Sequence, residues 1–242
     1  MILQKTAEIF GRTPKFKLEE AGGRSFVVAT AGLVELILKT AQRRSSRFGL
    51  VTVAEICAVI AADCRGSDVR SFVHQVLSTR DDIRWLDAGQ EWFWLASTPR
   101  NPLVASVRKL LSYASRVSFV DVQRAAARLP RKPKTAIKPA ALREFCQQAP
   151  FCRLRGNTVE LVPAFASSKL VHGPEAVVCR ILRRNGNELL FERLQALCEA
   201  SGVSRPNLWR IVLYSPLIYR TRRRVYRVVS PQGGLVQRAK AC

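Results

Sequence analysis

The sequence predicts an α+β protein, mostly helical, in which three helices followed by a β-hairpin occur three times in tandem. Three pairs of short segments recur along the chain, and each pair alternates apolar and polar residues around a short polar connection, as β-hairpins do. Before each pair lie stretches with apolar residues three or four positions apart, which is the spacing of an amphipathic helix.

The hairpins recur at a nearly constant interval. The expected strand pairs are 83–86 with 92–95, 151–154 with 158–161, and 217–220 with 225–228. Each strand therefore starts at almost the same distance from its counterpart in the next pair. A period this regular indicates tandem duplication of one fold unit.

Two capping boxes support the register of the helices. Thr52 to Glu55 and Ser118 to Asp121 each place a hydroxyl residue three positions before a carboxylate, and both lie at nearly the same distance before the first strand of their hairpins. Ser67 is a further candidate N-cap. The expected helices are 33–44, 52–62 and one from Ser67; 101–113, one from Ser118 and 139–148; and 174–184, 190–200 and 204–214.

The repeats divide the chain into five segments. Residues 1–32 form an extension that either contains a small β element, with strands at 16–18 and 26–28, or packs on the first repeat. Residues 231–242 are expected to form a flexible basic tail. Between them lie the three repeats, named here unit 1 (33–98), unit 2 (99–165) and unit 3 (173–230).

The charge of the chain is large and unevenly distributed. Forty Lys and Arg against eighteen Asp and Glu give a net charge of +22. Residues 1–100 hold fourteen cations and eleven anions, whereas residues 101–242 hold twenty-six and seven. Thirty of the cations are Arg, which binds phosphate and guanine in a bidentate manner. A field of this size indicates a polyanionic partner, and we expect double-stranded DNA contacted by units 2 and 3.

Three helices followed by a hairpin is the order of a winged helix-turn-helix, whose third helix enters the major groove while the hairpin wing lies against the backbone. The Val53-Ala-Glu-Ile56 helix, the aromatic Trp92-Phe-Trp94 hairpin and the closing Val225-Tyr-Arg-Val228 strand also resemble bacterial tandem winged-helix proteins. These include modules related to sigma-factor DNA-binding regions and to the RNA polymerase delta subunit. The resemblance covers about residues 33–229 and implies a role in transcription.

The third helix of unit 3 is the best candidate for reading bases. Ser204 is a favourable N-cap, and a proline at 206 is tolerated in the first turn. Arg205, Asn207 and Arg210 lie near the helix N-terminus, the part that faces base edges in a docked recognition helix. A solvated helix face is the alternative.

Cations are expected to contact the DNA backbone from the wing of unit 3 and from unit 2. Like charges crowded on one hairpin are costly unless an anion neutralises them, although a solvated charge run is the alternative. Lysines around the connection 128–138 suit a backbone clamp with little base discrimination. The expected backbone contacts are Arg220, Arg222, Arg223, Arg224, Arg131, Lys132, Lys134, Lys138, Arg143, Arg153 and Arg155.

Unit 1 is charge-neutral, and Asp68 near the start of its third helix disfavours phosphate. Its hairpin is aromatic, and we expect the outward-facing members to form an apolar patch for self-association or for docking to RNA polymerase. The alternative is a neutral spacer. The aromatic residues of this expected patch are Trp85, Trp92, Phe93 and Trp94.

Little in the sequence indicates catalysis. No Asp, Glu or Cys lies at metal-ligand spacing from His74 or His172, and the seven cysteines contain no CxxC pair. The Asp81-Asp82 pair is better explained as a helix-terminal turn than as a nuclease cluster. We therefore expect no cofactor, no metal and no catalytic residue. No stretch has the length of a membrane span, which favours a cytoplasmic, nucleoid-associated protein with no membrane partner.

The favoured function is a sequence-selective duplex-DNA-binding regulator of transcription. The alternatives are a protein-docking adaptor with general DNA affinity, a replication initiator, and a nuclease or restriction-associated subunit. RNA is a further possible polyanion. No aromatic platform for single strands is apparent in the basic half of the sequence, which favours a duplex.

Overall fold

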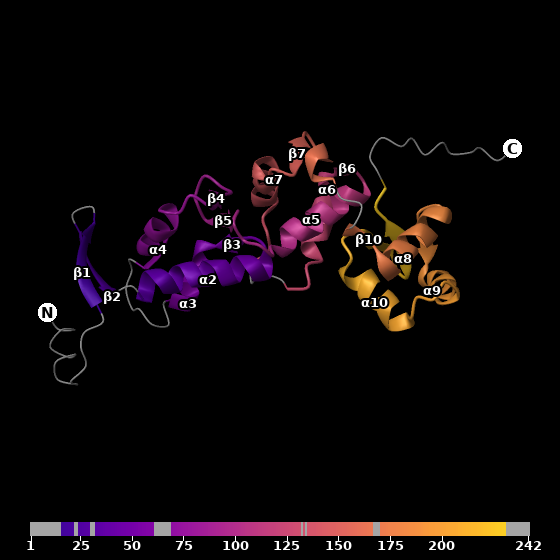
Figure 1. The fold of residues 1–242 in the computed structure, drawn as a ribbon, viewed down its shortest axis with the longest axis horizontal. Coiled ribbons are helices and arrows are strands. Elements are labelled where there is room, and N and C mark those ends of the chain that lie inside the picture. The colour runs from indigo at the N-terminus through magenta and orange to yellow at the C-terminus, as the bar shows by residue number, and fades with distance from the viewer. Residues whose placement is uncertain are drawn as a thin grey trace.

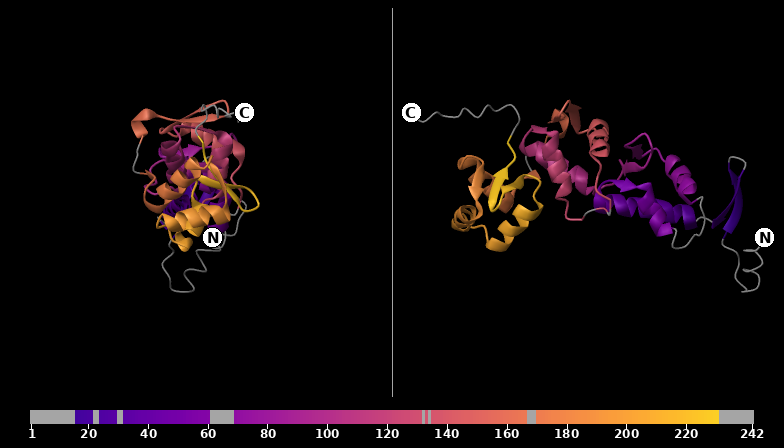
Figure 2. Two further views of the ribbon diagram at one scale, coloured as in Figure 1. Left: turned by 90° about the vertical axis from the view of Figure 1, so that its right-hand side faces the viewer. Right: turned by 180° about the vertical axis from the view of Figure 1, so that it is seen from behind.

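The computed structural model describes residues 16–21, 24–29, 32–60, 69–131, 133, 135–166 and 170–230. Over these residues the coarser part of the predicted fold class is confirmed: the chain is α+β and mostly helical, with three small antiparallel three-stranded sheets. The units follow one another along the long axis of the molecule, with unit 2 in the middle (Figure 1). The same row is visible from behind in Figure 2.

One order of elements occurs three times: helix, short strand, two helices and two strands. Unit 1 contains α2 (Gly32–Phe48), β3 (Val51–Thr52), α3 (Val53–Ile60), α4 (Val69–Ser78), β4 (Ile83–Trp85) and β5 (Trp92–Leu95). Unit 2 contains α5 (Pro102–Tyr113), β6 (Arg116–Ser118), α6 (Phe119–Ala127), α7 (Pro139–Gln148), β7 (Cys152–Arg155) and β8 (Thr158–Leu161), followed by the 3₁₀ turn η1 (Pro163–Phe165). Unit 3 contains α8 (Gly173–Arg184), β9 (Glu188–Leu190), α9 (Phe191–Ala200), α10 (Arg205–Tyr214), β10 (Ile218–Arg222) and β11 (Val225–Val228).

Each sheet contains a short strand that the sequence pattern does not reveal. The strand orders are β3-β5-β4, β6-β8-β7 and β9-β11-β10, so the second hairpin strand is central in every unit. The outer short strand precedes the second helix and pairs antiparallel through Val51 with Phe93, Val117 with Val159, and Leu189 with Tyr226. These strands are only two or three residues long, too short to show a periodicity.

The capping interactions expected in units 1 and 2 are present. The backbone N–H of Glu55 donates to Thr52 Oγ1 at 3.1 Å. In α6 the box is reciprocal, because Asp121 N–H donates to Ser118 Oγ at 3.1 Å and Ser118 N–H donates to Asp121 Oδ2 at 3.3 Å. Ser67 lies outside the described residues.

Of the two alternatives for the N-terminal extension, the structure contains the small β element. Strands β1 (Phe16–Ala21) and β2 (Arg24–Ala29) pair antiparallel, with Phe16 opposite Ala29. Gly22 and Gly23 between them, and the tail 231–242, lie outside the described residues.

The side chains on the two faces of strand β5 pack into two different hydrophobic cores. Phe93 and Leu95 belong to a cluster within unit 1, whereas Trp92 and Trp94 belong to a larger cluster that runs through units 2 and 3. The Trp94 ring meets the ring of Phe145 in α7 edge-on, with centroids 5.1 Å apart. Unit 2 therefore covers one face of the unit 1 hairpin.

A close backbone approach fixes the junction between units 1 and 2. Asn101 caps α5 by accepting from the N–H groups of Leu103 and Val104 at 3.0 and 3.1 Å. Its amide also donates to the carbonyl of Gly49 at 2.8 Å. Gly49 has φ +89°, and a Cβ there would lie 2.5 Å from Leu103 Cβ. Only glycine fits this position without a shift.

Polar contacts accompany the shared core between units 2 and 3. Lys109 in α5 pairs with Glu175 in α8 at 2.7 Å. The Arg128 guanidinium donates to the carbonyl of Val212 in α10. The Arg124 guanidinium lies 4.6 Å from the centre of the Tyr219 ring. The third helix and hairpin of unit 3 are therefore held against α6.

In the part of the chain that the structure describes, no helix is both long and apolar enough to cross a membrane.

Candidate nucleic-acid interface

Helix α10 presents a basic and aromatic face on the side away from the core of unit 3. Leu208, Ile211 and Val212 are buried, and the helix packs on α8 and α9. Arg205 and Arg210 are exposed, and Asn207 is half-buried. The side chain of Asn207 accepts a hydrogen bond from Arg210 at 3.3 Å. Ser204 occupies the N-cap position without a side-chain capping bond.

The hairpin beside α10 has a tighter turn than the sequence suggests. Strand β10 extends to Arg222, which pairs with Val225, and the register shifts between Arg220 and Arg222. The expected four-residue connection is therefore a two-residue turn, Arg223-Arg224. Arg224 has φ +60°, the left-handed geometry that tight hairpin turns need.

Two glutamates neutralise part of the positive charge of this hairpin. Glu188 in β9 lies 2.8 Å from the guanidinium of Arg227 and 3.9 Å from that of Arg222. Glu192 in α9 pairs with Arg224. Arg220 and Arg223 are exposed, and neither has an ion-pair partner among the described residues. Arg220 and Arg223 are thus the described wing arginines without a carboxylate beside them, while Glu188 is shared between Arg222 and Arg227.

A groove of about 530 Å³ lies between α10 and the hairpin. Its floor is aromatic: the Phe191 ring lies 4.6 Å from the Trp209 ring and 5.6 Å from the Tyr226 ring, between centroids. Its lining also includes Arg205, Arg220, Arg223 and Arg224. Folding thus brings together three aromatic residues of the basic half from separate elements, and of these Trp209 is exposed whereas Phe191 and Tyr226 are buried.

In unit 2 two of the expected phosphate contacts have partners within the chain. Arg143 donates to the carbonyl of Gly156 at 2.8 Å and to Asn157 Oδ1 at 2.9 Å, and so ties α7 to its hairpin turn. Arg155 lies 3.8 Å from Glu160. Arg153 is exposed on the same hairpin.

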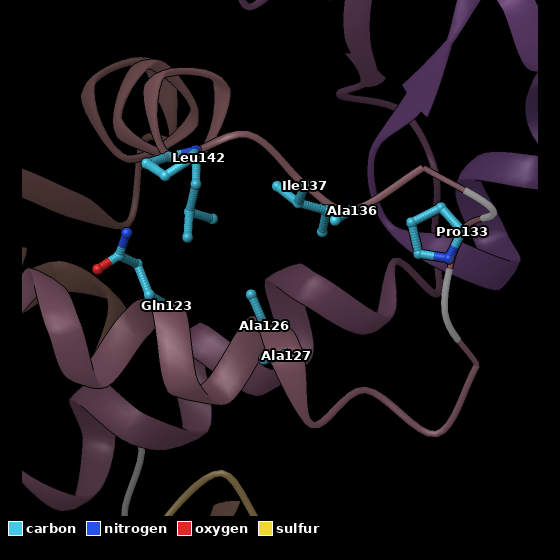
Figure 3. Close-up of a pocket in the computed structure, with 8 residues that line it drawn as sticks. Gln123, Ala126, Ala127, Pro133, Ala136, Ile137 and Leu142 are labelled. Carbon is cyan, nitrogen blue, oxygen red and sulfur yellow. The ribbon is translucent and has the colours of Figure 1, made fainter.

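Described residues of the connection before α7 border an apolar hollow. Arg131 and Lys138 are exposed, whereas Lys132 and Lys134 lie outside the described residues. A cavity of about 330 Å³ separates the connection from α6. In Figure 3 Ile137 and Leu142 lie across this cavity from Gln123 and Ala126 of α6. The opposite end of α7 contacts unit 1, where Gln148 donates to the carbonyl of Trp85 at 2.9 Å.

The structure does not place the unit 1 aromatics in an exposed patch, and this expectation is corrected. The side chains of Trp92, Phe93 and Trp94 are 1%, 0% and 5% exposed. Trp85 is half-buried and stacks on His74, with ring centroids 4.8 Å apart. The strand does alternate, as expected, but unit 2 covers the face that the sequence predicts to be free.

Outside this interface, the pKa values of one carboxyl and two cysteine thiols are shifted by an ion pair or by burial. Arg80 binds Asp82 in a bidentate manner at 2.7 and 2.8 Å and holds the pKa of that carboxyl below its usual value. Burial raises the pKa of the Cys179 thiol to about 12 and that of Cys198 to about 11. Among the described residues, no group of three or more His, Cys, Asp or Glu side chains is arranged to hold a metal ion.

No known family model matches the sequence, and no curated protein is significantly similar to it.

Proposed function

We propose that the protein is a non-enzymatic, double-stranded DNA-binding protein built from three winged-helix units, of which unit 3 makes the main sequence-recognising contacts. The topology supports this, because each unit has three helices and an antiparallel sheet whose terminal hairpin follows the third helix. In winged helices the third helix enters the major groove and the hairpin lies against the adjacent backbone.

The observation that carries the proposal is the position of the unit 3 arginines that have no ion-pair partner among the described residues. Arg205 from the third helix and Arg220 and Arg223 from the hairpin border one groove. In this arrangement Arg205, Asn207 and Arg210 face base edges, while Arg220 and Arg223 bind phosphates. Arg222 and Arg224 contribute less, because carboxylates already neutralise them.

The remaining units have supporting roles in this proposal. Unit 2 adds backbone contacts through Arg131, Lys138 and Arg153, which are exposed. Unit 1 holds unit 2 in place and does not offer its aromatic hairpin to RNA polymerase or a second copy, because three of the four aromatic side chains are buried. Sequence-selective readout by unit 3 suits a nucleoid-associated regulator of transcription.

A protein-docking adaptor is the second candidate. Leu213 and Tyr214, at the C-terminal end of α10, are 53% and 51% exposed. Large apolar side chains on a surface helix suit a protein partner as well as base methyl groups. In that case the arginines provide only general DNA affinity.

Selection of binding sites from random duplex DNA tests the proposal, with retention measured at about 50 and 200 mM salt. An Arg205→Ala/Arg210→Ala variant is expected to lose sequence preference. An Arg220→Ala/Arg223→Ala variant is expected to bind all sequences more weakly, with the salt slope smaller by about 2. The matched control is Arg180→Ala/Arg184→Ala, which removes the same charge from α8, the helix behind α10.

The outcomes separate the two candidates. A selected motif that survives high salt and disappears in the helix variant establishes a specific regulator. If no motif emerges and the control weakens binding as much as the other variants do, base readout is excluded. The adaptor function then accounts for the charge.

A further inference from the structure

Trp209 has an unusual position for a tryptophan. It is 40% exposed, while Trp92 and Trp94 are buried and Trp85 is half-buried. Its ring rests against Phe191, which in turn contacts Tyr226. The buried Phe191 and Tyr226 rings thus hold a large aromatic surface at the opening of the groove.

The chemistry around this ring is that of a nucleotide site. Arg205, Arg220 and Arg223 line the same groove, and the two hairpin arginines lack carboxylate partners among the described residues. Gln195 adds an amide to the lining, and the carboxylate of Glu192, which also lines the groove, is paired with Arg224. An aromatic ring that stacks on a base, with cations placed for its phosphate, is the usual arrangement for binding unpaired nucleotides. The groove volume of about 530 Å³ lies in the range of small-ligand sites.

Bases inside a duplex do not reach such a site. Their faces are covered by neighbouring base pairs, so a duplex offers the groove only phosphates, sugars and base edges. An unpaired nucleotide has a free face, and its phosphate would meet the arginines. Charge complementarity therefore favours a strand of nucleic acid over an apolar peptide as the occupant.

We propose that the groove between α10 and the β10–β11 hairpin binds an unpaired nucleotide of a DNA strand that adjoins the bound duplex, with its base stacked on Trp209. This inference rests on the proposed function, because the duplex must lie against the same unit. It assigns the protein a preference for duplexes with a frayed end, a tail or a displaced base.

The test compares a blunt duplex with the same duplex carrying a short 3′ or 5′ tail, using the full-length protein. The first tail position carries 2-aminopurine, whose fluorescence falls when it stacks on an aromatic ring. One tail polarity is expected to raise affinity by about five- to 150-fold, the range for one base stacked on an aromatic side chain. The 2-aminopurine signal is expected to be quenched on binding.

Variants assign the effect to the ring. Trp209→Leu is expected to abolish both the tail preference and the quenching while leaving the affinity for blunt duplex nearly unchanged. Trp209→Phe is expected to retain part of both. Tyr214→Leu is the matched control, because Tyr214 is an exposed aromatic on the same helix that does not line the groove.

The result that overturns the inference differs from the one that overturns the proposed function. Tight binding of blunt duplex without tail preference or quenching removes the nucleotide site and leaves the DNA-binding function in place. Equal loss of blunt and tailed binding in Trp209→Leu also removes it, because Trp209 then contacts the duplex itself. Trp209 fluorescence quenched by free deoxynucleotide as strongly as by the tailed duplex indicates a free-nucleotide site and also overturns the inference. Failure to bind any DNA defeats the proposed function instead.

Discussion

Substituting Gly49 by alanine tests how tightly units 1 and 2 are joined. Gly49 follows α2 with φ +89°, and its carbonyl accepts from the Asn101 side chain. A Cβ at this position would lie 2.5 Å from Leu103 Cβ and 3.1 Å from Asn101 Oδ1. Both contacts belong to the start of α5, so the new methyl group pushes directly on the junction.

The magnitude follows from two terms. Placing a side chain at positive φ costs about 1–2 kcal/mol. Overpacking a close contact costs about 1–3 kcal/mol more, because neither the Leu103 Cβ nor the backbone behind it can rotate away. We therefore expect Gly49→Ala to lower the free energy of unfolding by about 2–5 kcal/mol. Gly186→Ala is the matched control, because Gly186 has φ +78° with nothing near its absent Cβ.

Urea denaturation followed by tryptophan fluorescence measures the difference. With a slope of about 1–3 kcal/mol per molar urea, the Gly49→Ala midpoint should fall by roughly 1 M or more. Gly186→Ala should lose only the backbone term, about 1–2 kcal/mol. Equal losses in the two variants would refute the reasoning, because the contact with Leu103 would then contribute nothing.

Three further predictions concern charge and burial. Glu188→Gln releases the wing arginines and is expected to tighten duplex binding by roughly two- to fivefold at low salt, since one like charge near phosphates is worth about 0.5–1 kcal/mol in water. Glu199→Gln makes the same charge change away from the wing, and an equal gain there would contradict the pairing argument. Asp82 has a depressed pKa in the folded state, so its contribution to stability is present above the unfolded carboxyl pKa of about 3.9 and is lost as the pH falls through the folded value. The stability gap between wild type and Asp82→Asn in urea should therefore be full at pH 7 and close in strong acid, and a pH-independent gap would show that ionisation of Asp82 does not matter. Burial raises the pKa of the Cys198 thiol to about 11, so iodoacetamide at pH 8 should label it slowly in the native protein and rapidly in urea; rapid native labelling would show that the thiol is accessible.

The sequence predicts the longer elements of each unit because their periodicity is local. Helix α7 spans Pro139–Gln148, as expected, and strands β5 and β8 also have the expected bounds. The short strands β3, β6 and β9 are not predicted, because strands of two or three residues form only where a hairpin already offers a free edge. The tight turn at Arg223-Arg224 is not predicted either, because its composition gives no turn signal, lacking both glycine and asparagine.

The candidate site depends on contacts between distant residues, and these are not visible in one sequence. Phe191, Trp209 and Tyr226 come from three different elements that are well separated along the chain, yet their rings form one floor. For the unit 1 aromatics the sequence instead predicts an exposed surface that the structure shows to be buried. Alternation in β5 correctly gives Trp92 and Trp94 a common face, but only the packing of α7 on that face shows that it is covered.

The junction between units 2 and 3 has a consequence for the proposed binding to DNA. Arg128 is half-buried, and burial lowers the pKa of its guanidinium. It donates to the backbone carbonyl of Val212 in α10. Removing an arginine from water for a single neutral acceptor is costly. The hydrogen bond, however, restrains the orientation of α10 relative to α6, because it is directional and apolar packing is not. Because Lys109–Glu175 and the shared core restrain the same junction, α10 cannot turn independently of α6. If the proposed function is right, units 2 and 3 would therefore approach a duplex as one body, and their phosphate contacts would reinforce each other only on DNA whose path fits both units.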